Sequence, residues 1–360
     1  MDRIAALLDA ALVRKIGSAA VLSIGDAGVE VERIVRGHTR RVPDLGAPID
    51  ERARFDVASL TKPIVTVASA MVLVGEGRLD LDDPIRRWIP GAASTGTVRH
   101  LLGHASGCIA HVEFFRTMRV GEHPDPRREL LDLAARVPAN PPGVTTVYSD
   151  LGYIQLGAIV ERAAGLPLEE VFAELVAGPL GLEARYAGIE PIADAVATEL
   201  DDPATSERGL VCGRVHDENA YYGGGICGHA GLFATIEDVA RFAQAILETH
   251  AGRSRGKLLP SVVQRFAGEA AAPSTTWRLG FDTPSREPGV SQAGDLWPRD
   301  GALGHTGFTG TSLWLDLPHR RWVALLTNRV HPTRFGTSAE DIKTLRRAVN
   351  DAAFDLLERC

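Results

Sequence analysis

The chain has 360 residues, of which 45% are hydrophobic and 24% charged, a composition typical of a globular protein with a large apolar core. Its 39 basic and 46 acidic residues give a formal net charge of −7, which argues against a surface for nucleic acid or anionic membranes. Only four of the basic residues are lysines, so a lysine inside a motif is informative: Lys15, Lys62, Lys257 and Lys343.

The N-terminal part of the chain is predicted to contain a helix followed by a β-hairpin. Apolar residues recur at helical spacing between Ile4 and Leu12. Two strand-like runs follow at 19–24 and 29–35, and the glycine-containing segment 25–28 between them is typical of a turn.

The middle of the chain, from residue 63 to about 250, is predicted to consist of helices and loops. The helical candidates are 64–74, 151–164, 168–177 and 236–249.

Toward the C-terminus, strand patterns return after a loop-like stretch at 267–301. The runs 312–317 and 322–327 form a second candidate hairpin. A final helix is expected to begin at Ser338, because Asp341 follows it at the spacing of a capping box.

This order of elements predicts an α+β fold with one inserted domain. Hairpins at both ends of the chain favour an antiparallel β-sheet, flanked by the N- and C-terminal helices. We expect residues 1–62 and 255–360 to form the sheet domain and residues 63–254 to form the inserted, mostly helical domain.

The four cysteines form no C-x-x-C pair and are predicted to be mostly buried free thiols: Cys108, Cys212, Cys227 and Cys360. The longest apolar run, 63–74, is shorter than the roughly 18 residues of a transmembrane helix. No signal peptide is visible. The chain as written is therefore expected in the cytoplasm, or in the periplasm or outside the cell if a leader was removed.

Three familiar patterns are set aside because of their context. The G-x-G-x-x-G pattern at 223–228 does not follow a buried strand, as a dinucleotide site requires. The G-x-S-x-G pattern at 252–256 follows a predicted helix instead of a strand. His100 and His104 lack the glutamate of the zinc motif H-E-x-x-H.

The sequence S-L-T-K at 59–62 is the first motif that carries chemistry. Ser59 and Lys62 are three residues apart, so they lie on one face of a helical turn, where a lysine could take the proton of a serine nucleophile. Pro63 suggests that the regular helix begins there and that Ser59 lies on a tight leading turn. The alternative is a helix-start serine beside a solvated lysine.

Two further triplets accompany this motif. Y-S-D at 148–150 follows a proline-glycine turn and precedes an apolar helix, and H-T-G at 305–307 precedes a predicted strand. Taken alone, the tyrosine could be a core residue and the glycine could only permit close backbone approach.

Together and in this order, the three motifs resemble the serine β-lactamase and penicillin-binding protein superfamily, whose signature is S-x-x-K, then Y-x-N or S-x-N, then K/H-T/S-G. The resemblance is closest to the class C β-lactamase branch, with its β-lactamase-like carboxylesterases and D-Ala-D-Ala carboxypeptidases. It covers nearly the whole chain, because flanking segments also resemble that branch: 77–84, 101–107, 228–233 and 326–329.

The resemblance implies a role for each motif. Ser59 would be the acylated nucleophile, Lys62 the neutral base, and Tyr148 the group that passes the proton to the leaving group and later activates water. His305 would occupy the sheet-edge position usually held by lysine or histidine. The backbone N–H groups of Ser59 and Phe308 would form the oxyanion hole, in a site between the two domains that needs no metal or cofactor.

The implied substrate-binding residues are Asp150, Thr306, Gly307, Phe308 and Arg329. Two positions depart from the superfamily pattern. Asp150 replaces the usual asparagine, so it could pair with Lys62 and weaken that base, or bind a substrate N–H or ammonium. His305 is mostly neutral at its ordinary pKa and does not supply fixed charge for a substrate carboxylate, a role that Arg329 could take.

The sequence therefore predicts a serine hydrolase that acts on ester, β-lactam or D-Ala-D-Ala-type amide substrates through a Ser59 acyl-enzyme. A non-hydrolysing penicillin- or peptide-binding sensor and an acyltransferase on the same scaffold are the alternatives. The expected partner is a small-molecule or short-peptide acyl substrate, with no nucleic acid and no membrane span. The sequence does not define the oligomeric state.

Overall fold

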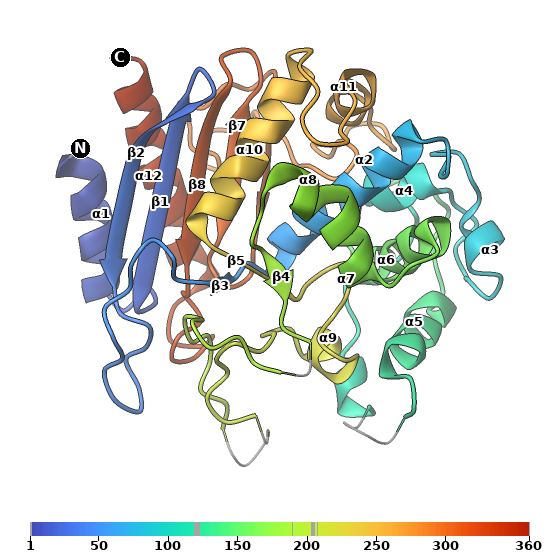
Figure 1. Ribbon diagram of the computed structural model, residues 1–360, viewed down its shortest axis with the longest axis horizontal. Coiled ribbons are helices and arrows are strands. Elements are labelled where there is room, and N and C mark those ends of the chain that lie inside the picture. Colours follow the sequence, from blue (N-terminus) through green and yellow to red (C-terminus); the bar gives the residue numbers. More distant parts are fainter. Residues whose placement is uncertain (1, 119–122, 189, 203–205, 207, 360) are drawn as a thin grey trace.

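The computed structural model describes residues 2–118, 123–188, 190–202, 206 and 208–359. It is built on a five-stranded sheet in which neighbouring strands are all antiparallel (Figure 1). The predicted α+β class with an antiparallel sheet is therefore confirmed. The strands, in spatial order, are β2 (Val29–Gly37), β1 (Ala19–Asp26), β8 (Arg321–Thr327), β7 (Ser312–Asp316) and β6 (Ala302–Thr306).

The two terminal helices cover one face of this sheet. α1 (Asp2–Val13) and α12 (Ala339–Leu357) pack against each other and against the sheet (Figure 1). Their apolar side chains bury a core that includes Leu8, Trp314 and Val349. The predicted capping box of the last helix is present, because the hydroxyl of Ser338 accepts the N–H of Asp341 at 3.1 Å.

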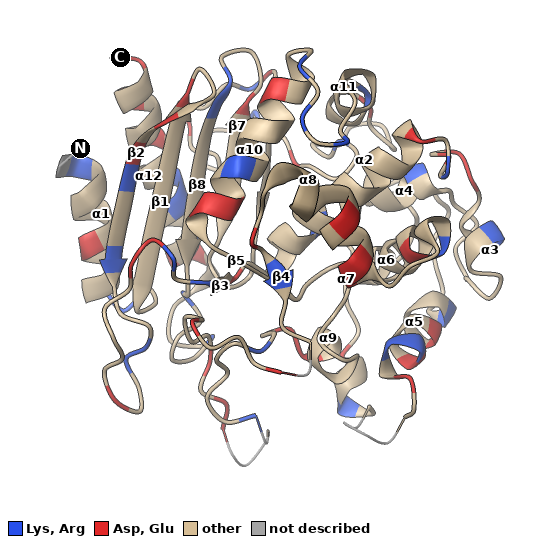
Figure 2. Cartoon of the chain, viewed as in Figure 1, with Lys and Arg blue, Asp and Glu red and all other residues tan. Residues whose placement is uncertain are grey.

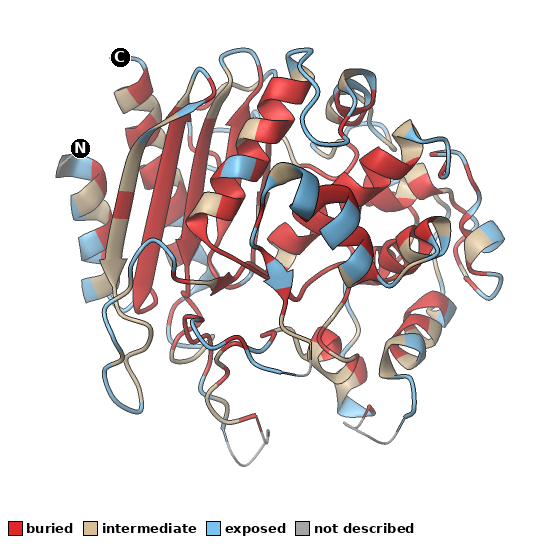
Figure 3. Ribbon diagram, in the orientation of Figure 1, coloured by how far each residue is buried: buried red, intermediate tan, exposed pale blue. Residues whose placement is uncertain are grey.

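The opposite face of the sheet packs against α10 (Ile236–His250) and, beyond it, the remaining helices (Figure 1). Figure 3 shows that β1 and β8 are buried, whereas the edge strand β2 is mostly only partly buried. These helices are α2 (Ala68–Gly75), α3 (Ile85–Trp88), α4 (Val98–Leu102), α5 (Pro126–Arg136), α6 (Asp150–Ala164), α7 (Leu168–Phe172), α8 (Gly178–Leu180), α9 (Glu218–Tyr222) and α11 (Pro260–Gly268).

Charged residues of both signs are mixed on the solvent side of these helices (Figure 2). On α10, for example, Arg241 binds Glu237 at 2.7 Å, and on α5 Arg128 binds Asp132 at 3.0 Å. Such pairs keep the helical surface free of a single-sign patch.

The four helices predicted in the middle of the chain are present with small differences. The first begins as a π-helix at Lys62–Val67 and continues as α2, and the third continues from α7 into a π-helix at Ala173–Ala177. The second and fourth are α6 and α10. Further short 3₁₀ turns lie at Ala58–Leu60 and Phe114–Arg116.

Residues 58–75 form one continuous helical run of 18 residues that is apolar enough to cross a membrane by length and composition. The run is longer than the apolar segment 63–74 identified in the sequence. Because 83% of it is buried inside the structure, it is the core helix around which the other helices pack.

Several short elements were not predicted. β6 has only five residues and includes Gly304, which has low strand propensity. A small second sheet joins β3 (Phe55–Asp56), β5 (Leu232–Ala234) and β4 (Arg185–Tyr186). The expected loop is found at 269–301, where no helix or strand occurs. The glycine-rich segment 223–228 follows the helix α9 and not a strand. This agrees with the argument that the segment is not a dinucleotide site.

The cysteines agree with the prediction as far as the described residues extend. Cys108 and Cys227 are buried free thiols and Cys212 is a half-buried one. Cys360 lies outside the described residues.

Asn328, just after β8, joins three distant parts of the chain. Its Oδ1 accepts the N–H groups of Ser18 and Ala19 at 2.8 and 3.0 Å. Its Nδ2 donates to the hydroxyl of Ser18 at 2.8 Å and to the carbonyl of Ala197 at 2.7 Å. Because Asn328 is 1% exposed, water cannot replace these bonds.

We expect Asn328→Ala to lower the free energy of unfolding by about 3 kcal/mol, because several buried polar groups lose their partner. Ser18→Ala removes only one of the bonds and should cost about 1 kcal/mol. Urea unfolding followed by circular dichroism measures both values. Equal losses for the two variants would contradict this role of Asn328.

Candidate active site

Ser59 lies on a tight turn that leads into the core helix. Ala58, the residue before it, has a left-handed φ of 47°, a strained conformation for a residue with a side chain. The carboxylate of Asp56 holds this turn, because Oδ1 accepts the N–H of Ala58 at 2.8 Å and Oδ2 accepts the N–H of His216 at 2.7 Å. Ser59 remains partly exposed, so a small molecule can reach its hydroxyl.

Lys62, one turn later, has no exposed surface. Its Nζ donates to Ser59 Oγ at 2.8 Å, to Asp150 Oδ1 at 2.8 Å and to the carbonyl oxygen of His229 at 3.2 Å. Burial alone would lower the pKa of Lys62, but the Asp150 carboxylate and Tyr148 outweigh burial and raise it. Lys62 is therefore an ammonium at neutral pH.

Asp150 begins α6, where Ser149 caps the helix by accepting the N–H of Gly152 at 3.0 Å. The structure thus brings Asp150 against Lys62, the pairing that the sequence analysis considered. The second carboxylate oxygen lies 3.5 Å from Nδ1 of His111. Burial would raise the pKa of Asp150, yet the charge of Lys62 and the bond to His111 lower it, so Asp150 is ionised.

Tyr148 is partly buried beside the same ammonium group. Nζ of Lys62 lies 4.8 Å from the centre of the Tyr148 ring, and the Tyr148 hydroxyl is near enough to Lys62 and Ser59 for both to act on its pKa. Burial raises the pKa of Tyr148 although Lys62 opposes it, so the phenol keeps its proton at neutral pH. The hydroxyl can therefore donate a proton next to Ser59.

His305 lies on β6, the edge strand, and faces Tyr148 at a ring separation of 5.9 Å. Burial and the nearby Lys62 charge lower the pKa of His305 to about 3. Its Nδ1 lies 3.0 Å from the carbonyl oxygen of Thr306, so the neutral ring donates there. Nε2 is then an acceptor, and it has no partner among the described residues.

The turn between β6 and β7 is bonded directly to the chain before Ser59. The hydroxyls of Thr309 and Thr311 donate to the carbonyl oxygens of Asp56 and Val57 at 2.8 and 2.9 Å. Gly307 is needed here, because a Cβ atom would lie 2.5 Å from the Val57 carbonyl oxygen. These contacts hold the backbone of Phe308 next to the turn of Ser59.

Arg329, which follows β8, contacts the β6–β7 turn at Phe308. Its Nε donates to the carbonyl of Phe308 at 2.8 Å, and its guanidinium lies 4.6 Å from the centre of the Phe308 ring. Only 6% of Arg329 is exposed, whereas Phe308 is 51% exposed. Arg329 thus contacts the site through Phe308, and direct binding of a substrate carboxylate by Arg329 stays a prediction.

Sequence reasoning missed two aromatic residues that surround Tyr148. Trp277, from the loop 269–301, lies 5.5 Å from both Tyr148 and His305. His104 stacks 4.6 Å from Tyr148, and its Nδ1 accepts the N–H of Ser149 at 3.1 Å. His104 belongs to the flank 101–107 that carried part of the resemblance, whereas no sequence signal marks Trp277.

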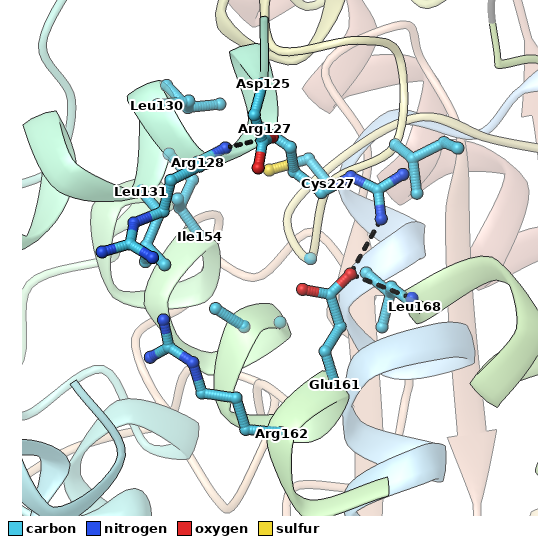
Figure 4. A pocket seen from close by; sticks show the side chains of 14 residues that line it. Asp125, Arg127, Arg128, Leu130, Leu131, Ile154, Glu161, Arg162, Leu168 and Cys227 are labelled. Carbon is cyan, nitrogen blue, oxygen red and sulfur yellow. Dashed lines mark hydrogen bonds and ion pairs between the residues drawn. The ribbon is translucent and has the colours of Figure 1, made fainter. Parts of the chain in front are cut away.

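A cavity adjoins Tyr148 and His305. Its wall combines aromatic rings with polar side chains, and the lining residues are Tyr148, Trp277, Asp282, Gln292, His305, Thr306 and Trp314. A second cavity lies on the other side of α6, toward α5 (Figure 4).

The chain matches the family described as "Beta-lactamase" over residues 4–346. It is 29% identical to the "Putative D-alanyl-D-alanine carboxypeptidase" of Escherichia coli K12 over 303 residues, which are 77% of this chain and 69% of that protein. It is 28% identical to the "N-acetylmuramyl-L-alanine amidase" of Bacillus subtilis over 313 residues, which are 79% of this chain and 70% of that protein.

Solved structures share the fold. EstCE1, "a hydrolase with promiscuous acyltransferase activity", superposes with a TM-score of 0.73 at 23% identity, covering 97% of this chain and 98% of EstCE1. The octameric penicillin-binding protein homologue from Pyrococcus abyssi gives a TM-score of 0.73 at 21% identity, covering 99% of this chain and 77% of that protein.

We expect Asp150→Asn to move the alkaline-rising limb of Ser59 reactivity to lower pH by about one unit or more. The carboxylate raises the pKa of Lys62, so without it the neutral lysine forms at lower pH. The measurement is the rate of Ser59 labelling by a fluorophosphonate as a function of pH. Asp132→Asn, which removes a surface carboxylate on α5, is the matched control. An unmoved limb in Asp150→Asn would refute the coupling.

Proposed function

The chain belongs to the β-lactamase family, and from this premise we propose that it is a serine hydrolase that works through an acyl-enzyme on Ser59. The family and its relatives support a hydrolase. The observation that carries the finer proposal is the 2.8 Å hydrogen bond between Nζ of Lys62 and Oγ of Ser59 at a buried lysine. A serine becomes an effective nucleophile when an adjacent base takes its proton.

The reactive form is the fraction of the protein in which Lys62 has lost its proton, a fraction that Asp150 keeps small. In the acylation step, Oγ of Ser59 attacks the acyl carbonyl carbon as its proton passes to this neutral Lys62. The new oxyanion is bound by the backbone N–H groups of Ser59 and Phe308, a type of donor worth roughly 3–4 kcal/mol of barrier each. The contacts of Thr309 and Thr311 with the chain before Ser59 support this assignment, because they fix the two donors relative to each other.

Collapse of this intermediate breaks the bond to the leaving group, which takes a proton from Tyr148. Tyr148 is reprotonated from Lys62, which restores the neutral lysine. In deacylation, water attacks the acyl carbonyl carbon and its proton passes to neutral Lys62, directly or through the Tyr148 hydroxyl, and the bond from the acyl carbon to Oγ then breaks as Oγ takes this proton from Lys62. The acid product then leaves.

The charges around Ser59 support esters and other acyl compounds without a carboxylate next to the scissile bond as preferred substrates. Asp150 is ionised, His305 is neutral at any pH well above about 3, and Arg329 is covered by Phe308. The ammonium of Lys62 is already paired with Asp150 at 2.8 Å, so a carboxylate on the substrate would meet no unpaired cation among Lys62, His305 and Arg329. β-Lactams and D-Ala-D-Ala-type peptides carry such a carboxylate.

One observation favours a second candidate, a non-hydrolysing binder that is acylated slowly. The Asp150 carboxylate, 2.8 Å from Nζ, keeps Lys62 protonated and so limits its supply of base. An acyltransferase uses the same residues and differs only in the acceptor that replaces water.

The first test is intact-protein mass spectrometry after separate incubation with a fluorophosphonate and with a penicillin. We expect a fluorophosphonate adduct and little penicillin adduct in the wild type. Ser59→Ala should give neither adduct and no hydrolysis of p-nitrophenyl acetate, with a melting temperature within a few degrees. An active Ser59→Ala protein would exclude Ser59 as the nucleophile, and a stable adduct without turnover would favour the binder.

We expect His305→Lys to improve kcat/KM for substrates with a carboxylate relative to neutral esters by about tenfold. The lysine would add a cation where the wild type has a neutral imidazole. Paired ester substrates that differ only in a carboxylate and a methyl ester provide the measurement. His305→Gln keeps the site neutral and is the control, and an unchanged ratio in His305→Lys would refute the charge argument.

A further inference from the structure

Three more ionisable side chains lie next to the segment that Lys62 contacts, and they touch one another in series: Cys227, His229 and Asp217. We call these three side chains the relay. Sγ of Cys227 lies 3.1 Å from Nδ1 of His229, and Nε2 of His229 lies 3.0 Å from Oδ1 of Asp217. Cys227 is 6% exposed and His229 is 1% exposed. The mechanism above uses only the backbone carbonyl of His229, so the three side chains have no role in it.

A thiol, an imidazole and a carboxylate in this order are the arrangement that activates cysteine nucleophiles. The carboxylate of Asp217 accepts Nε2–H, which leaves Nδ1 free to take the proton of Cys227. Burial would raise the pKa of Asp217, but His229 lowers it to about 2, so the carboxylate is ionised.

His229 is correspondingly suited to carry positive charge. Burial lowers the pKa of His229, but Cys227 and Asp217 outweigh burial and raise it. The surrounding charges come from Lys62, whose Nζ donates to the His229 carbonyl, and from Asp150 and His111.

The strand β4 restrains the backbone of Cys227 through Tyr186. The Tyr186 hydroxyl donates to the Cys227 carbonyl at 2.8 Å.

Cys227 also borders a cavity between α5 and α6 that is separate from the cavity at Tyr148 (Figure 4). The cavity has a volume of about 130 Å³ and an apolar floor that includes Leu130, Ile154 and Ile226. Arg127 crosses it to reach Glu161 at 2.8 Å. Because Cys227 is one of the lining residues, a small reagent in this cavity can reach the thiol.

The chain on the C-terminal side of Cys227 leads directly to the catalytic lysine. The Gly228 carbonyl accepts the Thr66 hydroxyl at 2.7 Å, and the His229 carbonyl accepts Nζ of Lys62 at 3.2 Å. Gly228 crosses α6 so closely that a Cβ atom there would lie 2.8 Å from Cα of Gly157. A group added to Sγ disrupts the contact of Cys227 with Nδ1 of His229, the residue whose carbonyl Lys62 binds.

We propose that Cys227 is a reactive thiol that small electrophiles and peroxides modify through the cavity between α5 and α6, and that its modification disables Ser59. With an alkyl iodide, the S–C bond forms as the C–I bond breaks and iodide leaves. With hydrogen peroxide, the sulfur attacks one oxygen, the O–O bond breaks and hydroxide leaves. The sulfur is then a sulfenic acid, oxidised by two electrons as the peroxide is reduced.

The test is iodoacetamide labelling of the full-length chain at about pH 7, resolved by peptide mass spectrometry in a Cys360→Ser background. Cys108 and Cys212 serve as internal references, because burial raises the pKa of both thiols. We expect Cys227 to be alkylated about tenfold faster than either. Asp217→Asn should slow Cys227 to the rate of the references.

The coupling to Ser59 is measured on the same samples with a fluorophosphonate, and this part rests on the proposed function. We expect Ser59 labelling to fall in parallel with Cys227 alkylation, and to be insensitive to iodoacetamide in Cys227→Ala. Hydrogen peroxide should give the same pattern, reversed by dithiothreitol.

Each failure has a distinct meaning. Cys227 labelling no faster than that of Cys108 would overturn the reactive thiol, whatever Ser59 does. An unchanged Cys227 rate in Asp217→Asn would overturn the relay. Full Ser59 labelling after Cys227 is alkylated would overturn the coupling. A wild-type Ser59 that never reacts would instead count against the proposed function and leave the iodoacetamide result to decide on Cys227.

Discussion

A lysine ammonium with no exposed surface needs an acceptor for each of its donors, and this requirement organises the centre of the molecule. The acceptors of Lys62 come from three separate stretches of chain: Ser59 on its own turn, Asp150 at the start of α6 and the His229 carbonyl before β5. Burying an unpaired charge costs several kcal/mol, so these stretches are stable only when they meet at Nζ.

The ion pair between Asp150 and Lys62 stabilises the fold but lowers the reactivity proposed for Lys62. Asp150 compensates the buried charge of Lys62, yet it also holds the proton on the amine that serves as the base in the proposed mechanism. An asparagine at this position would still offer an acceptor oxygen but would leave more of the desolvation cost uncompensated. The strained turn at Ala58 also lowers stability, and it persists because the buried Asp56 and the threonines of the β6–β7 turn hold it in place.

Residue pattern predicted the terminal helices, the core helix, α6, α10 and both hairpins of the large sheet, but it missed α5 and α11. Fixed spacing predicted the contact between Ser59 and Lys62. Short elements such as β6 and the two-residue strand β3 escaped, because their pairing comes from tertiary contacts and not from propensity. The Asp150–Lys62 pair could be considered from the motifs alone, since both residues were already assigned to one site. The position of Trp277 beside Tyr148 could not be predicted, because no periodic signal links a loop residue to Tyr148. The Cys227–His229–Asp217 relay depends on how the chain after α9 folds back to the start of that helix, where Asp217 lies.

The bonds between the β6–β7 turn and the nucleophile turn also determine when the site can exist during synthesis. Thr309 and Asp56 are separated by 253 positions in the chain. At about 5–20 residues per second, the ribosome needs roughly 13 to 50 s to make that interval. The turn that bears Ser59 and the core helix that follows it therefore leave the ribosome long before the β6–β7 turn that is bonded to them. Until the last strands dock, the nascent protein carries Ser59 and Lys62 without the contacts from Thr309 and Thr311.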